Sequence, residues 1–205
     1  MIRILNIQDM TPDDIFMRRP EDSSAVTDVV AAILAEVRER GDGALRDYTE
    51  RFDGWRPDAL EVTQAEWDAG VSSLDPELLA VLTEARDNIA SFHEHQKREG
   101  FSFEKPGILL GQKVTPLRRA GVYVPGGKAA YPSSVLMNIV PAKVAGVDEI
   151  IMCTPCDPSG KVYASTLVAA KEAGADVIYK CGGTRHGFGH PLDPDRHEMH
   201  HRLCL

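Results

Sequence analysis

The chain has 205 residues, of which 43% are hydrophobic and 26% charged, and its formal net charge is −8. This composition predicts a folded protein with a buried core and excludes a chain that is disordered throughout. The negative charge disfavours binding to nucleic acid or to an anionic membrane surface, because both need a basic face. Small molecules and proteins are therefore the expected partners.

The start of the chain indicates a cytoplasmic protein. Its one early apolar run, "ILNI", is too short for the hydrophobic region of a signal peptide. No apolar stretch approaches the roughly 18 residues that cross a bilayer. In a reducing compartment we expect Cys153, Cys156, Cys181 and Cys204 to be thiols and not disulfides.

Four helices are expected in the first half. Apolar residues at 26, 29, 30, 33, 34 and 37 predict an amphipathic helix from Ser23 or Ser24. "GDG" at 41–43 separates it from a shorter helix that ends at Asp53-Gly54. A capping-box pattern predicts a short helix over 63–69. Asp75-Pro76 then opens a long helix, whose expected apolar stripe consists of Leu78, Leu82, Ala85, Ile89 and Phe92.

The second half has a different pattern. The Gly- and Pro-rich segment 104–121 predicts a hairpin or short extended pieces and a subdomain boundary. After it, "GVYV", "PSSVLMNIVPAKVAG", "DEIIMCT", "KVYASTLVAAKEAG" and "ADVIYKC" alternate strand and helix, and Pro141 should kink the first helix or lie near a break. Such alternation predicts parallel strands with crossover helices.

We therefore expect an α/β protein with three regions. Residues 1–115 form an N-terminal helical region, residues 116–183 form an incomplete doubly wound, Rossmann-like parallel sheet, and residues 184–205 form a tail that we predict to be disordered. The strands missing from the sheet should leave an unpaired edge, which favours association.

The loop "YVPGGKAAYPSS" follows the first strand of this sheet, where ligands of such folds bind. Gly126 and Gly127 would let the backbone approach a ligand closely, and the amides near Ser133 and Ser134 could face an anion. Taken alone, a Gly-Gly turn after a strand is more often structural.

At this loop the sequence resembles a known family. "GVYVPGGKAAYPSSVLMNIVPAKVAGVDEIIM", with "EVRERGDGALRDYTERFDG", "ARDNIASFHEHQK" and "YKCGG", is similar to the N-terminal part of histidinol dehydrogenases, over residues 1–183. The resemblance implies oxidation of L-histidinol through histidinal to L-histidine, the last steps of histidine biosynthesis, by a homodimer that uses NAD and zinc. It implies NAD contact at Tyr123, and Gly126 and Gly127 belong to the same candidate cofactor loop. The alternative for Tyr123 is a half-buried strand residue.

The sequence departs from the family after Gly183. Thr184, Arg185 and His186 stand where the family has Ala, Gln and Ala, so the glutamine that contacts NAD is absent. The family's Glu-His pair and zinc ligands lie in a later part that this sequence does not match. We therefore predict no catalytic residue and no zinc ligand here, a frameshifted or otherwise truncated chain, and no activity of the chain alone. The alternative is a non-catalytic fragment that acts as a binding or assembly partner of another subunit.

Two further patterns are less informative. His197 to His201 spell H-E-x-x-H, a zinc-protease signature, but this tail offers no third ligand and few residues to stabilise a helix. Cys153, Cys156 and Cys181 could gather at one edge of the sheet as a metal or redox site. We favour reduced thiols, because no fourth ligand is placed.

Overall fold

The computed structural model of the chain describes residue 8 and residues 24–126 and 129–182. It divides into two compact units, Met1–Ala32 and Ile33–Leu205. The described part of the first unit is residue 8 and the first half of one helix. In the second unit, helices from both halves of the sequence share one core with the sheet. The boundary expected at residue 115 stays a prediction, and the predicted tail 184–205 lies outside the described residues.

In the described residues of the first half lie the four predicted helices, α2 (Ser24–Arg40), α3 (Asp42–Asp53), α4 (Gln64–Ser73) and α5 (Pro76–Glu94). Their ends carry the expected caps. Gly54 terminates α3 in the left-handed conformation, with φ 74°. Thr63 and Glu66 form the capping box of α4, and the Asp75 side chain accepts a hydrogen bond from the Glu77 amide at 2.9 Å.

The apolar face of α5 differs from the predicted stripe. Leu82 is buried, and Ala85 and Ile89 pack against the main core, but Leu78 is 39% exposed and Phe92 is 63% exposed. Leu79 packs in place of Leu78. Both leucines lie at helical spacing from Leu82, at i+4 and i+3, so periodicity cannot choose between them. The choice is made by the direction from which α6 and α7 approach α5.

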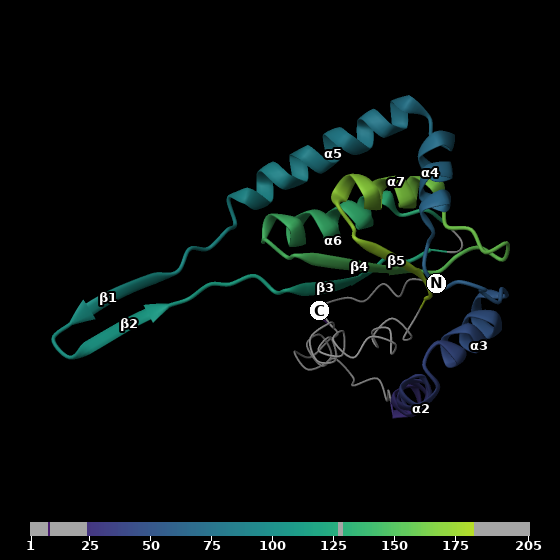
Figure 1. The fold of residues 1–205 in the computed structure, drawn as a ribbon, viewed down its shortest axis with the longest axis horizontal. Coiled ribbons are helices and arrows are strands. Elements are labelled where there is room, and N and C mark those ends of the chain that lie inside the picture. Colours follow the sequence, from purple (N-terminus) through teal and green to yellow (C-terminus); the bar gives the residue numbers. More distant parts are fainter. Residues whose placement is uncertain (1–7, 9–23, 127–128, 183–205) are drawn as a thin grey trace. The chain divides into compact units, whose positions relative to one another are not determined.

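A three-stranded parallel sheet follows, in the order β3 (Arg119–Tyr123), β4 (Glu149–Thr154) and β5 (Val177–Lys180). The crossover helices are α6 (Pro132–Val144) and α7 (Ala164–Ala173). This confirms the predicted β-α-β-α-β alternation and the α/β fold (Figure 1). Pro141 lies inside α6, three residues before its end, which agrees with the prediction that it lies near a break.

Helices cover both faces of the sheet. Side chains of adjacent strand residues point to opposite faces, and here they feed two separate clusters. One packs under α5, α6 and α7 and includes Ile139, Ile150, Met152 and Ile178. The other lies under α3 and the second half of α2 and includes Val37, Leu45, Ile151, Tyr179 and Cys181. Figure 1 shows α6 and α7 on one side of the strands and α3 on the other.

Strands β1 (Phe101–Lys105) and β2 (Ile108–Gln112) form the hairpin predicted in this region, although it begins three residues before the predicted segment. Gly107, with φ 76°, allows the tight turn between them. Every residue of both strands is exposed, and these include Phe101, Phe103, Ile108, Leu109 and Leu110. A two-stranded ribbon is marginally stable by itself.

The prediction of an unpaired sheet edge is wrong for β5, an edge strand of the sheet. The extended segment 60–62 covers that edge: the Lys180 amide donates to the Leu60 carbonyl at 2.7 Å, and the Val62 amide donates to the Ile178 carbonyl at 2.8 Å. Glu61 and Tyr179 form the antiparallel bridge between them. Residues that precede the sheet in sequence thus cover the free side of β5. Within the described residues, no helix is both long and apolar enough to span a membrane.

Candidate functional site at the carboxyl edge of the sheet

The carboxyl ends of the three parallel strands meet at one edge, where α/β sheets bind ligands. Tyr123, Thr154 and Lys180 are the last residues of β3, β4 and β5. Tyr123 is half-buried and lies opposite Cys153 in the strand register. It therefore shares the face that carries Tyr179 and Cys181, away from α6 and α7. This places the predicted cofactor tyrosine at the expected edge; its contact with NAD stays a prediction.

The loop after β3 is packed closely against the loop after β4. The Val124 amide donates to the Cys153 carbonyl at 2.9 Å, which extends the strand pairing by one residue. A Cβ added to Gly126 would lie 2.9 Å from the Pro155 carbonyl oxygen and 3.0 Å from Thr154 Oγ1. Any larger residue at 126 would push the two loops apart, so close loop packing explains this glycine. Gly127 lies outside the described residues.

Helix α6 begins near this edge with its first amides open. Tyr131 is its N-cap residue and makes no side-chain capping hydrogen bond, while Pro132 occupies the first turn. The amides of Ser133 and Ser134 therefore lie at a helix end that no side chain caps, together with the positive end of the helix dipole. Such an end suits a phosphate group.

Two of the predicted thiols come together and the third does not join them. The Cys153 and Cys181 thiols are hydrogen-bonded to each other, and this bond, together with burial, holds the pKa of Cys153 well above its usual value. Burial raises the pKa of Cys156 to about 11. Thiols that stay protonated at neutral pH are poor nucleophiles and metal ligands. None of these three cysteines is in a disulfide, which confirms the reduced-thiol prediction for them, while Cys204 lies outside the described residues.

A buried lysine at this edge was missed by sequence reasoning. The side chain of Lys180 is 6% exposed, and its Nζ lies 2.8 Å from Glu66 Oε1 on α4. Burial opposes ionisation of Glu66, but hydrogen bonds from Lys180 and Thr63 outweigh it, and the pKa of Glu66 lies below its usual value. The available signal was a lysine that ends an apolar strand, "VIYK", and so needs a buried partner.

Trp55 completes the surroundings of Lys180. The Lys180 ammonium lies 5.2 Å from the centroid of the Trp55 ring, within the range of a cation–π interaction. The ring also lies against Gly160 in the loop after β4, since a Cβ added there would fall 2.3 Å from Trp55 Cε2. Residues 55 and 66, from the N-terminal half, thereby contact the loop after β4 and the end of β5.

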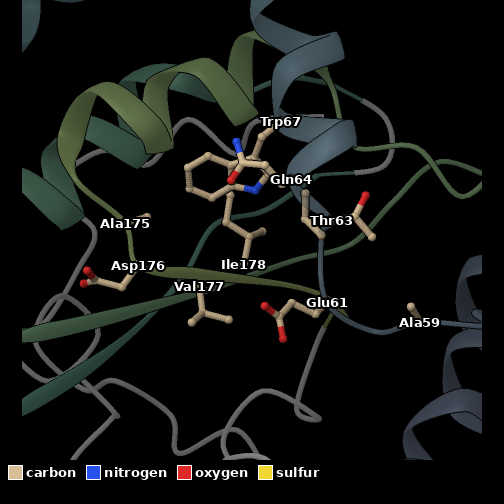
Figure 2. A pocket seen from close by; sticks show the side chains of 10 residues that line it. Ala59, Glu61, Thr63, Gln64, Trp67, Ala175, Asp176, Val177 and Ile178 are labelled. Carbon is tan, nitrogen blue, oxygen red and sulfur yellow. The ribbon is translucent and has the colours of Figure 1, made fainter.

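A pocket of about 360 Å³ lies elsewhere, along the first half of β5. Gln64 and Trp67 line it from α4, and Asp176 and Ile178 line it from the strand side (Figure 2). Its charged lining is acidic, from Glu61 and Asp176, with no basic residue among its lining side chains. Phosphate-bearing ligands would be repelled here, so this pocket is a poor candidate for nucleotide binding.

The described ranges contain no group of three or more His, Cys, Asp or Glu side chains arranged to hold a metal ion. The described residues therefore do not fit zinc. The residues of the H-E-x-x-H pattern, His197 to His201, lie outside the described part of the chain.

Comparison with known proteins decides the family. The family model for histidinol dehydrogenase matches residues 16–186. The chain belongs to the histidinol dehydrogenase family. It is 54% identical to the histidinol dehydrogenase of Chlorobaculum tepidum over 154 residues, which is 75% of the chain and 36% of that relative. The Heliobacterium mobile enzyme is 46% identical over 188 residues, 90% of the chain and 44% of the relative.

The fold agrees with a solved structure of the same family. The crystal structure of histidinol dehydrogenase from Elizabethkingia anophelis matches with a TM-score of 0.76 and 31% identity, over 83% of this chain and 39% of that one. The chain thus spans less than half of the histidinol dehydrogenases it matches. Histidinol dehydrogenases are oxidoreductases, so the chain belongs to an oxidoreductase family. The matched share of the relatives does not establish the activity of the 205 residues.

Proposed function

We propose that the chain provides the nucleotide-binding edge of a histidinol dehydrogenase, an oxidoreductase that converts L-histidinol through histidinal to L-histidine with NAD. The observation that carries this proposal is the position of Tyr123 at the carboxyl end of β3, in a family member, directly before the glycine loop and the uncapped start of α6. Parallel sheets bind dinucleotides at this edge.

The residues of this edge suit the parts of a dinucleotide. The Tyr123 ring is half-buried, so it offers an apolar face to a ribose or a flat ring while its hydroxyl can reach a polar group. The amides at the start of α6 offer donors to a pyrophosphate. NAD, when bound, would accept the hydride that leaves the alcohol carbon. Tyr123 and the helix amides would orient it and take no part in proton transfer.

We propose that the 205 residues alone do not complete the oxidation. An alcohol loses hydride at a useful rate when a base removes its proton and a cation stabilises the alkoxide. The described residues do not fit zinc, and the matched share of the relatives is 36% to 44%. No step through zinc is therefore derived. The thiols that are not in disulfides agree with the cytoplasmic location that we also propose.

We further propose that the chain associates with a second copy or with a subunit that supplies the rest of the enzyme. The exposed apolar residues of the β1–β2 hairpin favour such a contact, because a ribbon with this much exposed apolar surface gains stability when it is covered. A non-catalytic role as an assembly partner is the second candidate function, supported by the same hairpin.

Calorimetric titration of the purified chain with NAD⁺ tests the nucleotide proposal. We expect saturable binding, at least tenfold weaker for Tyr123→Ala and unchanged for Phe103→Ala, which removes an exposed aromatic ring from the hairpin. Equal affinity of Tyr123→Ala and the unmodified chain would contradict the assigned site. Robust NADH formation from histidinol by the chain alone would contradict the proposed lack of turnover.

A further inference from the structure

Lys180 is unusual in being a lysine buried inside the protein, at a strand end that lies at the proposed nucleotide edge. Among the described residues, the buried polar or charged side chains are Lys180 and three threonines. A buried lysine requires a partner for its charge, and Lys180 has two: the Glu66 carboxylate at 2.8 Å and the Trp55 ring at 5.2 Å.

The geometry points to a positioning role: we propose that Lys180, Glu66 and Trp55 form a junction that holds two loop segments, residues 155–161 after β4 and residues 181–182 after β5, in the arrangement that binds the dinucleotide. This inference rests on the proposed nucleotide site. We define the junction by these three residues. It joins the end of β5 to two segments from the N-terminal half of the sequence, the segment after α3 and the start of α4.

Glu66 links two elements through its two carboxylate oxygens. Glu66 uses Oε2 to accept from the Thr63 amide at 2.8 Å, which closes the capping box of α4, and uses Oε1 to accept from Lys180. One carboxylate thus fixes both the first turn of α4 and the end of β5. The two residues that follow Lys180, Cys181 and Gly182, are buried and enter the loop at the carboxyl edge directly.

Trp55 transmits the same constraint to the loop after β4. Gly160, at φ 80°, leaves room for the indole ring, and the loop around it is closed by Asp157, whose carboxylate accepts from the Ser159 and Lys161 amides at 2.8 and 3.0 Å. This loop and the indole therefore pack as one unit. Loss of the Lys180 cation would remove a contact that holds the Trp55 ring, and the loop packed against the ring would loosen with it.

Direct contact between Lys180 and a nucleotide is disfavoured. The side chain is 6% exposed and its ammonium already faces a carboxylate and a ring, so little of it is available to a ligand. Lys180 therefore acts through the loops, and its charge matters because the pairing with Glu66 depends on it. Arginine keeps that charge and can pair with a carboxylate, whereas methionine keeps the apolar stem and loses the charge.

Hydrogen exchange of the whole chain, read by mass spectrometry, tests the junction independently of any nucleotide. In Lys180→Met we expect exchange in residues 155–161 and 181–182 to rise at least tenfold, with α6 unchanged. Lys180→Arg should restore exchange to within about threefold of the unmodified chain. Lys171→Met is the matched control, because it removes an exposed lysine whose partner, Asp68 at 3.7 Å, also belongs to α4. If Lys180→Met does not fold, Glu66→Gln, which keeps the shape of the side chain, should loosen the same two loops.

NAD⁺ affinity then links the junction to the site. We expect affinity to fall at least tenfold in Lys180→Met, to recover in Lys180→Arg and to stay unchanged in Lys171→Met. Unchanged exchange in both loops of Lys180→Met, or loosened loops with unchanged affinity, would overturn the inference. If the unmodified chain binds no NAD⁺, the proposed function fails, while the exchange comparison still decides whether the junction holds the two loops.

Discussion

The contact between Gly160 and Trp55 makes one substitution especially informative. Gly160→Ala places a Cβ 2.3 Å from Trp55 Cε2 and 2.6 Å from its Cζ2, well inside contact distance, at a residue with φ 80°. Gly54→Ala is the matched control, because Gly54 has φ 74° and nothing within 4 Å of the added Cβ. The two variants therefore share the backbone strain and differ in the collision with the ring.

The magnitudes follow from these two terms. An alanine held in the left-handed backbone conformation lowers the free energy of unfolding by about 1 kcal/mol. This strain is the whole effect expected of Gly54→Ala. Displacement of the packed indole adds about 2 kcal/mol, so Gly160→Ala should lower the free energy of unfolding by about 3 kcal/mol. Urea denaturation followed by circular dichroism measures both values.

A double-mutant cycle isolates the ring term. In a Trp55→Ala background the collision is gone, and Gly160→Ala should cost only about 1 kcal/mol, as Gly54→Ala does. Equal costs for Gly160→Ala and Gly54→Ala in the unmodified chain would refute the close packing of Trp55 on Gly160. The same would hold if the cost of Gly160→Ala did not fall when Trp55 is removed.

Three further predictions concern the core, the loop after β4 and the thiols. Ile139→Ala, at a fully buried site of α6, should lower the free energy of unfolding by about 3 kcal/mol in urea, against less than about 1 kcal/mol for the exposed Met137→Ala. Hydrogen bonds, the largest from the Ser159 side chain, lower the pKa of Asp157 in the folded chain, so its contribution to stability is present above the usual pKa of 3.8 and is lost as pH falls through the lower folded value. In Asp157→Asn, urea titrations at several pH values should show a smaller loss of unfolding free energy on acidification. An unchanged dependence of that free energy on pH would exclude the effect. Cys153, whose pKa is held well above its usual value by the Cys181 thiol and by burial, should resist thiol reagents at neutral pH in the folded chain and react in urea, as mapped by mass spectrometry of labelled peptides. Rapid labelling of Cys153 in the folded chain would contradict its protonated state.

The predicted elements follow from local chemistry, and this is why they agree with the structure. The Thr63–Glu66 capping box and the Asp75-Pro76 start depend on residues within one turn of each other, so the sequence contains all the information needed. Alternation of apolar strands and amphipathic helices likewise predicts parallel strands with helical crossovers, which the register of β3, β4 and β5 confirms.

What could not be predicted depends on contacts between distant residues. Glu66 and Lys180 are 114 positions apart, and no periodicity links them. The covering of β5 by segment 60–62 was missed for the same reason, since that segment is extended but has no strand-length pattern of its own. The choice of Leu79 over Leu78 on α5 depends on where α6 and α7 lie, which is a property of the assembled core.

The location of bound NAD⁺ tests the central proposal most directly. Hydrogen exchange of the chain with and without saturating NAD⁺ should show protection at residues 123–126, 154–156 and 181–182, at the carboxyl ends of all three strands. Residues 61–64 and 175–178, which line the acidic pocket, should exchange at the same rate in both samples. Protection confined to that pocket, or none at all, would contradict a nucleotide site at the carboxyl edge of the sheet.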